Sequence, residues 1–342
     1  MNYKQALEQV LAGHDLAHAD MLNLMQQVMS GELTPAQIAG LVIALRVKGE
    51  SVDEITAAAT VMRELSTKVE IADKTHLIDT CGTGGDGIQT FNISTCAAFA
   101  AAAAGAKVAK HGGRSVSSTC GSADVLEALG VNMNVSPAQV AKCVDEIGIG
   151  FMFAPNHHSA MKHAAPVRRE LGVRTIFNLL GPLTNPANAH RQIMGVFSKD
   201  LTLKLAKVLQ NLGSKHVLVV HGADGMDEIS FTGDTFVAEL KDGKISEYTL
   251  NPAQFGLKIH ALKSIKVENA EQSKAIILDV LVGKHSAGKQ SAARDIVLLN
   301  AGAAIYVAGL QASIHAGIEH AANVIDSGAA RQKLNELIGL ST

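Results

Sequence analysis

Hydrophobic and polar residues follow two different periods along this chain. In residues 1–66 the spacing is helical throughout, and Thr34 and Ser51 stand at the expected N-caps of two helices. From about residue 70, short apolar runs typical of buried strands alternate with amphipathic helical segments. The runs that we interpret as strands are HLIDT, AKVAK, GIGFMFAP, RQIMGVF and HVLVVHG. This alternation predicts a largely parallel sheet covered by helices.

The predicted fold is therefore α/β, with two unequal domains. A chain of 342 residues with 47% hydrophobic residues exceeds the usual size of one domain. We expect a small all-helical domain at residues 1–70 and a larger α/β domain at residues 71–342, with a mostly parallel central sheet. Residues 229–250 alternate around Gly233-Asp234 and Asp242-Gly243, which predicts a local antiparallel excursion. The pattern beyond residue 270 is helical again.

The composition excludes several classes of partner. The net charge of −2 and the isoelectric point near 6.7 argue against nucleic acid, although a local basic cluster could still bind a phosphorylated small molecule. The N-terminus lacks the apolar core of a signal peptide, and the apolar run from Cys96 is about half the roughly 20 residues that span a bilayer. The four cysteines form no C-x-x-C pair, which favours reduced thiols and gives a zinc site no support. We expect a cytoplasmic protein with no nucleic-acid or membrane partner.

One glycine-rich segment, DTCGTGGDGIQTFNIST at 79–95, has the G-x-G-x-x-G spacing of dinucleotide-binding loops. In a dinucleotide fold the helix would open within the glycines, and an acidic residue about 20 positions later would bind the ribose. Here a long loop at 81–91 is expected to precede a helix that begins near 92–94, and Lys107 and Lys110 occupy the later region. This context argues against a nicotinamide or flavin cofactor. The N–H groups of a glycine loop and a helix N-terminus favour a phosphate instead.

A second segment of the same kind follows the next predicted strand. KHGGRSVSSTCGSAD, at 110–124, combines glycines, cations and hydroxyls ahead of a helix that is expected to begin near Ser122. Lys110, His111 and Arg114 are stronger candidates for ligands than isolated surface charges would be. Two consecutive loops of this kind at the carboxyl edge of one sheet predict a ligand with more than one phosphate.

Four motifs, in this order, resemble the anthranilate phosphoribosyltransferase family over nearly the whole chain. They are GTGGDG with TFNIST, KHG-x-R-S-V-S-S, HHSAMKHAAPVRRELGVRTIFNLLGPLTNP and GMDEIS. The resemblance implies a small helical domain that includes some mid-chain helices, joined to a larger α/β domain of the type also found in pyrimidine nucleoside phosphorylases. It also implies a homodimer formed through the helical domain. The implied reaction joins phosphoribosyl pyrophosphate (PRPP) and anthranilate to give N-phosphoribosyl-anthranilate and pyrophosphate, in tryptophan biosynthesis, with Mg2+ as cofactor.

The resemblance also implies which residues form the site. Arg168, in APVRRELG, and Gly82 would bind anthranilate, and the fork of a guanidinium suits the carboxylate of that substrate. Asp227 and Glu228, in GMDEIS, would bind Mg2+ together with Ser94. The residues that would hold PRPP are Gly82, Gly85, Asp86, Thr90, Asn92, Ile93, Ser94, Thr95, Lys110, His111, Gly112, Gly113, Arg114, Ser115, Val116, Ser117, Ser118 and Ser122.

Plainer structural roles remain open for several of these residues. Asn92 and Ser94 could serve only to cap a helix. Without the motif, Asp227 and Glu228 would be solvated charges of an exposed turn, and we expect their joint replacement to leave the fold intact. Arg169 is expected to be a surface charge.

Neighbouring residues invite further roles. His157, His158 and His163, which we place on one helix, are expected to be structural or to line the aromatic pocket, so no base is assigned. Asn178 and Pro182 either shape the aromatic channel or end a helix. Cys81 and Cys96 flank the first loop, and the dipole of the following helix could lower the pKa of Cys96 enough for oxidation to inactivate the protein. A small buried thiol is the alternative.

Other classes of protein fit the sequence less well. A pyrimidine nucleoside phosphorylase would share the fold, but the KHG-x-R and MDE motifs fit it poorly. A non-enzymatic relative that binds nucleic acid would need a strongly basic face. Within the family resemblance one departure stands out, because the family usually has KHGNR, with an Asn that contacts anthranilate, where this chain has Gly113.

Overall fold

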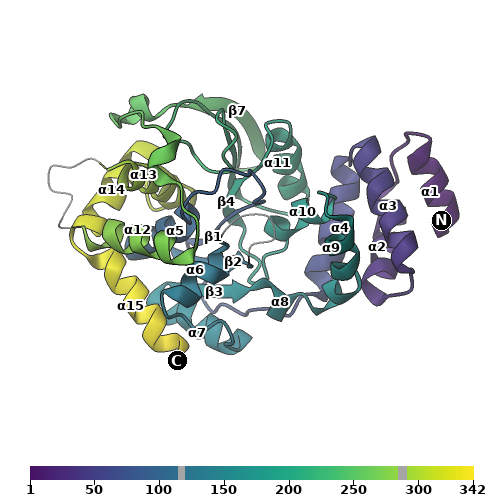
Figure 1. Ribbon diagram of the computed structural model, residues 1–342, viewed down its shortest axis with the longest axis horizontal. Helices are drawn as coiled ribbons and strands as arrows, with labels where there is room; N and C mark the ends of the chain where they lie inside the picture. The colour runs from purple at the N-terminus through teal and green to yellow at the C-terminus, as the bar shows by residue number, and fades with distance from the viewer. Residues whose placement is uncertain (115–119, 284–290) are drawn as a thin grey trace.

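The computed structural model describes residues 1–114, 120–283 and 291–342. At one end lies a bundle of N-terminal helices, shown in purple and blue in Figure 1, beside a larger α/β body. The N-terminal helices are α1 (Tyr3–Leu11), α2 (His18–Ser30), α3 (Pro35–Lys48) and α4 (Val52–Leu65). The hydroxyls of Thr34 and Ser51 accept backbone hydrogen bonds at the starts of α3 and α4, so both predicted N-caps are confirmed.

The α/β body is built on a seven-stranded sheet with the strand order β3-β2-β1-β4-β5-β6-β7. The strands are β1 (Leu77–Gly82), β2 (Lys107–Gly112), β3 (Ile149–Phe153), β4 (Arg191–Gly195), β5 (His216–Gly222), β6 (Thr235–Lys241) and β7 (Lys244–Leu250). The first five pair in parallel, and the last two add antiparallel. All five predicted strands are confirmed.

The antiparallel excursion is also confirmed, but only one of the two turn-forming pairs makes a tight turn between strands. Asp242 and Gly243 connect β6 to β7, and both have the positive φ that a tight hairpin turn requires. Gly233-Asp234 instead lies in the connection that leads from β5 into β6.

Strand order reverses next to β1, and this reversal positions the site. The chain moves outward from β1 to β2 and β3, and then returns to place β4 on the other side of β1. Gly82 at the end of β1 pairs with Gly195 at the end of β4. In open α/β sheets the crevice at such a switch point, beyond the carboxyl ends of the strands, is where ligands bind.

Helices cover both faces of the sheet, because alternate residues of the central strands pack to opposite sides. Ile193 and Leu218 face the core formed with the C-terminal helices, whereas Met194 and Val217 face the core shared with the N-terminal bundle. The helices of the body are α5 (Ile93–Ala103), α6 (Ser122–Ala128), α7 (Pro137–Ile147), α11 (Leu201–Asn211), α12 (Ala270–Val282), α13 (Ala292–Val307), α14 (Ile314–Asp326) and α15 (Ala329–Ser341). Two short 3-10 turns, η3 (Pro252–Phe255) and η4 (Leu262–Ile265), precede α12.

A mid-chain segment packs against the N-terminal bundle, where α10 contacts α4 and α9 contacts α3 (Figure 1). Its elements are α8 (Ala154–His157), η1 (Ser159–His163), α9 (Ala165–Leu171), α10 (Phe177–Leu180) and η2 (Gly181–Leu183). The expected class, a small helical domain plus a larger α/β domain, is confirmed. The boundary near residue 70 remains a prediction. His157 and His163 do not share one helix, because the segment breaks between α8 and η1. In the described ranges no helix is long and apolar enough to cross a membrane.

Candidate active site

The first glycine-rich segment forms the predicted loop between β1 and α5. The helix begins at Ile93, with Asn92 as its N-cap residue, after a loop in which Gly84, Gly85 and Gly87 all have positive φ. Glycine adopts such backbone conformations readily, because it has no Cβ. In any other residue the Cβ would lie too close to the backbone. The strand, loop and helix therefore stand where the sequence analysis placed them, at the carboxyl edge of the sheet.

The turn that follows β5 packs directly onto the ends of β1 and β4. A Cβ added to Gly82 would lie 2.3 Å from Oδ2 of Asp227, and one added to Gly195 would lie 1.5 Å from the backbone oxygen of Asp227. Only glycine leaves room for this approach. The Gly84 N–H donates to Oδ2 of Asp227 (2.8 Å), and the Ser94 N–H donates to Oε1 of Glu228 (3.1 Å).

The expectation of an exposed, solvated turn is therefore wrong. Asp227 and Glu228 are only partly exposed, and each carboxylate is bound by a backbone N–H of the glycine loop or of α5. Burial, and then the nearby Asp86 carboxylate, raises the pKa of Asp227. Burial, and then Asp227, raises the pKa of Glu228. The carboxylates of Asp86, Asp227 and Glu228 lie close enough to repel one another, so a cation bound among them would be stabilised.

This donor set fits a hard divalent cation that takes its remaining ligands from substrate. Within the described part of the chain, no group of three or more His, Cys, Asp or Glu side chains is arranged to hold a metal alone. Mg2+ is commonly held by one or two carboxylates plus substrate phosphates and water. Asp227 and Glu228 match that pattern. The Ser94 hydroxyl, at the same corner of the site, lies 3.3 Å from Nζ of the buried Lys110.

The second segment meets the first across the switch point. β2 ends at Gly112, where an added Cβ would lie 2.2 Å from Oγ of Ser122, and α6 begins at Ser122 as predicted. Lys110 donates to the Thr80 backbone oxygen, and the side-chain amide of Asn92 donates to the Cys120 backbone oxygen (3.2 Å). The structure thus brings the two loops together. The predicted site residues Ser115, Val116, Ser117 and Ser118 lie outside the described residues.

Several predicted PRPP residues already have partners within the protein. Oδ1 of Asn92 accepts a hydrogen bond from the buried Ser273 hydroxyl (2.7 Å), a contact from α12 that sequence reasoning missed. Ile93 packs in the core, and its N–H donates to Phe91. Thr95 is buried, and no partner for its hydroxyl is found in the described ranges. Thr90 forms an isolated bridge to Lys266.

Arg114 and His111 differ in exposure. Arg114 is exposed and pairs with Asp124 (2.9 Å) and Glu127 (2.8 Å) of α6. His111 is buried, and its Nε2 lies 3.2 Å from Nε2 of His158. Burial lowers the pKa of both histidines, so both are neutral near pH 7. Their burial and neutral state agree with structural roles, and neither histidine is assigned as a base.

Arg168 stands apart from the two loops, on α9. It is half-buried, with its guanidinium 5.6 Å from the centre of the Phe177 ring, and burial lowers its pKa. No hydrogen bond or ion pair joins this side chain to other described residues. Arg169 is exposed, as expected. A half-buried guanidinium without a carboxylate is suited to receive one from a ligand.

Arg174 is a second residue that the sequence analysis missed. Its guanidinium donates to the Gly85 backbone oxygen and lies 4.2 Å from the centre of the Phe197 ring. Its own backbone oxygen accepts a hydrogen bond from Arg46 of α3 (2.7 Å). Arg174 therefore ties the glycine loop to the helical domain. Its place inside the third motif was the available signal.

The expectation of a reactive Cys96 is wrong. The thiol is fully buried, and burial raises its pKa instead of lowering it. Burial and the Asp79 carboxylate likewise raise the pKa of Cys81. All four cysteines are free. The position of Cys96 near a helix N-terminus is outweighed by the loss of solvent around its sulfur.

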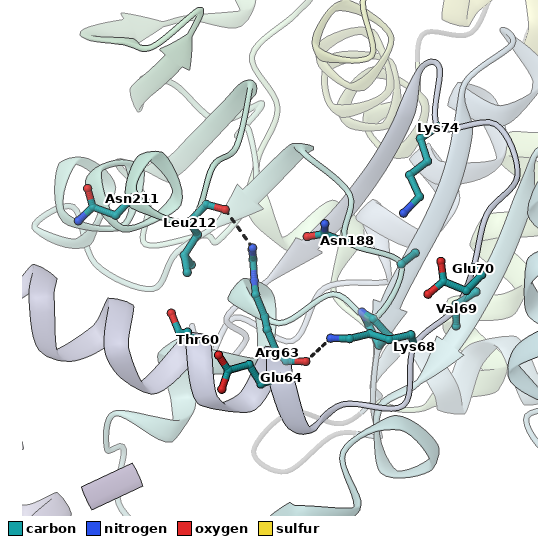
Figure 2. Close-up of a pocket in the computed structure, with 12 residues that line it drawn as sticks. Thr60, Arg63, Glu64, Lys68, Val69, Glu70, Lys74, Asn188, Asn211 and Leu212 are labelled. Atoms are coloured by element: carbon teal, nitrogen blue, oxygen red, sulfur yellow. Dashed lines mark hydrogen bonds between the residues drawn. The ribbon is translucent and has the colours of Figure 1, made fainter. Parts of the chain in front are cut away.

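A cavity of about 540 Å3 lies at the opposite, amino edge of the strands. Figure 2 shows Arg63 at its centre, with Lys68 and Glu70 to one side. Arg63 donates to the backbone oxygens of Leu183 (2.6 Å) and Leu212 (3.2 Å), which fastens α4 to the α/β body. The lining contains both cationic and acidic side chains, so this cavity has no preference for an anionic or a cationic ligand. We therefore place the candidate active site at the carboxyl edge of the sheet.

Comparison with known proteins assigns both parts of the chain to one family. Residues 4–66 match the glycosyl transferase family helical bundle domain, and residues 74–331 match the glycosyl transferase family α/β domain. Anthranilate phosphoribosyltransferase of Methylobacillus flagellatus is 62% identical over 341 residues, covering 100% of this chain and 98% of that protein. The enzyme of Thiobacillus denitrificans is 61% identical over 339 residues, covering 99% and 97%.

Solved structures of the same family are similar to this chain over nearly its whole length. Anthranilate phosphoribosyltransferase of Thermus thermophilus superposes with a TM-score of 0.91 at 42% identity, covering 98% of this chain and 99% of that one. The Saccharomyces cerevisiae enzyme in complex with PRPP and Mg superposes with a TM-score of 0.90 at 29% identity, covering 99% and 97%. Because relatives of this similarity extend over essentially its whole length, the chain belongs to the anthranilate phosphoribosyltransferase family.

Proposed function

We propose that this chain transfers the phosphoribosyl group of PRPP to anthranilate, giving N-(5-phosphoribosyl)anthranilate and pyrophosphate, in tryptophan biosynthesis. The observation that carries the proposal is the meeting of three elements at the switch point of the sheet. These are the glycine loop with the N-terminus of α5, the end of β2 with Lys110, and the carboxylate turn of Asp227 and Glu228. Such a corner suits a phosphorylated ligand held with a divalent cation.

PRPP is proposed to lie across the two loops. The glycines around Gly85, the buried ammonium of Lys110 and the α5 N-terminus supply donors and positive charge for its phosphates. The yeast relative was solved with PRPP and Mg, which supports the same ligands here. The full set of PRPP residues assigned from the sequence is kept as part of this proposal. Arg114 would have to leave its partners on α6 to take part directly.

Mg2+ is proposed to be held by Asp227, Glu228 and Ser94. When bound, the ion would neutralise the negative charge that grows on the pyrophosphate leaving group. Lys110, 3.3 Å from the Ser94 hydroxyl, adds a fixed positive charge at the same place.

Anthranilate is proposed to bind between the loops and the helical side, with its carboxylate on Arg168 and with Gly82 beside it. The half-buried guanidinium against Phe177 offers both a charge and an aromatic wall. A related yeast complex contains 4-fluoroanthranilate. No residue needs to act as a strong base, because the amine attacks a carbon that becomes electrophilic as pyrophosphate departs. Placement of the two substrates then supplies much of the rate.

The test of this function is the loss of anthranilate fluorescence when protein, PRPP and Mg2+ are mixed. We expect a decrease that requires all three components and stops when anthranilate is consumed. A folded sample that produces no PRPP-dependent decrease would refute the assignment. Phosphorolysis of thymidine by the same sample would point to a nucleoside phosphorylase instead.

We further propose a homodimer formed through the helical domain, and a cytoplasmic location. Leu11 and Val47, on α1 and α3, are 70% and 83% exposed, which leaves apolar surface on that domain for a partner. Four free cysteines suit a reducing compartment. Sedimentation equilibrium would test the dimer, with Val47→Glu expected to weaken it. A monomer at micromolar concentration would contradict the proposal.

A further inference from the structure

Asn300 is a buried polar residue that lies behind the carboxylate turn. It belongs to α13 and is only 3% exposed. Its Oδ1 accepts a hydrogen bond from the Ile229 N–H (3.0 Å), and its Nδ2 donates to the Ile229 backbone oxygen (3.0 Å). A third bond runs from Nδ2 to the Ile296 backbone oxygen, one helical turn away (2.9 Å). One side chain therefore binds both backbone polar groups of Ile229.

Ile229 directly follows Glu228, so this clamp holds the backbone beside a proposed metal ligand. On either side of Ile229, the neighbouring residues form hydrogen bonds within their own segment. Oδ1 of Asp224 accepts from the Met226 N–H (3.1 Å), and the Ser230 N–H donates to Oγ1 of Thr235 (2.9 Å). Asn300 anchors the backbone of the turn from outside it, from a helix 71 residues further along the chain.

The helix that carries Asn300 is a firm support. α13 packs against β1, β4 and β5, the three strands whose ends surround the switch point. The bond to Ile296 fixes the orientation of the amide, because it occupies an Nδ2 hydrogen on the same helix. Ile229 is itself buried, so its N–H and carbonyl would have no water to replace Asn300.

We propose that Asn300 is a positioning residue that sets the place of the Glu228 carboxylate, and so the affinity of the site for Mg2+ and PRPP. The inference rests on the proposed function. On one side Glu228 accepts from the Ser94 N–H of α5, and on the other side Asn300 fixes the next peptide group. The carboxylate and the peptide group that follows it are thus both held by hydrogen bonds, which restrains the Glu228 side chain. Outer partners of this kind commonly change metal affinity or activity by about 10–100-fold.

The experiment compares Asn300→Leu and Asn300→Ala with a control on the same helix. Leu keeps the branched shape of Asn in a somewhat larger side chain and removes all three hydrogen bonds, whereas Ala removes volume as well. Ile305→Val, near the C-terminal end of α13, removes buried volume but none of the hydrogen bonds of Asn300. Each variant is measured by amide hydrogen exchange of residues 226–230 without substrates, and by the KM for PRPP, the KM for anthranilate and the Mg2+ requirement.

We expect both Asn300 variants to exchange the Ile229 amide faster, and to raise the Mg2+ requirement and the KM for PRPP by about 10–100-fold. The KM for anthranilate should stay within about twofold, and Ile305→Val should change none of these values. Wild-type exchange and Mg2+ dependence in a folded variant would overturn the proposal. So would equal losses for both substrates, or failure of both variants to fold, since Asn300 would then be structural. If wild type itself consumed no anthranilate, the proposed function would fail while hydrogen exchange still tested the clamp.

Discussion

Replacing Gly113 with Asn tests the departure of this chain from its family. The resemblance implies that an Asn at this position contacts anthranilate, so the glycine should cost the chain one hydrogen bond to that substrate. A glycine could instead be required here by a strained backbone. The structure decides between these possibilities, because Gly113 is not among the glycines with positive φ.

The space around Gly113 is also sufficient for a side chain. Among the described residues, a Cβ added there would meet only the Ala154 Cβ, at 4.0 Å, which is an ordinary contact. Gly112, the residue before it, is the opposite case, since its Cβ would lie 2.2 Å from Oγ of Ser122. One neutral hydrogen bond is worth about 0.5–1.5 kcal/mol, or roughly twofold to tenfold in affinity. We therefore expect Gly113→Asn to lower the KM for anthranilate by about that factor.

Steady-state kinetics with each substrate varied in turn provides the assay, and Gly112→Ala is the matched control. Gly113→Asn should leave the KM for PRPP nearly unchanged and should not lower the melting temperature. Gly112→Ala should disturb the contact with Ser122, and so raise the KM for PRPP and destabilise the loop together. If Gly113→Asn behaved like the control, the reasoning from φ and free space would be refuted. An unchanged anthranilate KM would show that the family contact cannot form in this chain.

Four further outcomes are expected. Asp227→Ala with Glu228→Ala should raise the Mg2+ requirement by more than about 100-fold, exceeding what outer partners contribute, and circular dichroism should show whether the buried turn also loosens. Because the folded pKa of both carboxyls is raised, the stability of the metal-free protein should fall as pH rises from about 4, their ordinary pKa, through the raised values, and the melting temperature in EDTA would reveal this. Arg168→Ala should raise the KM for anthranilate by roughly 10–100-fold, because a charge-assisted bond is worth about 1.5–3 kcal/mol, and equal effects on PRPP would make Arg168 structural. Cys96 should resist iodoacetamide in the native protein, and rapid labelling would contradict its burial.

The fold was accessible from the sequence because its signals are local. The capping boxes at Thr34 and Ser51, the short apolar runs and the glycine that ends β1 each depend on a few neighbouring residues. Gly233-Asp234 shows the limit of such signals, because it lies at the end of a longer connection between the antiparallel strands β5 and β6 and not in a tight hairpin turn. A turn-forming pair predicts a bend, but the length of the connection depends on what the rest of the segment packs against.

The site was accessible only in part, because burial is a property of the assembled fold. The motif identified Asp227 and Glu228, but nothing near them in sequence revealed that Gly82 and Gly195 would press against their turn. The same cause explains the error about Cys96, whose place on a helix was correct while its solvent exposure was not. Ser273 and Asn300 act from distant segments, so no local pattern singled them out, and Arg174 was marked only by its place inside the third motif.

The contacts of the carboxylate turn connect the binding of cation and phosphate. The N–H of Gly84, in the glycine loop, donates to Asp227, and the N–H of Ser94, at the start of α5, donates to Glu228. A phosphate that approached alone would meet carboxylates on these donors, with repulsion between like charges. A divalent cation placed among the carboxylates reverses that repulsion, because it attracts both carboxylate and phosphate oxygens. PRPP and Mg2+ should therefore bind each more tightly in the presence of the other, by the same factor in both directions.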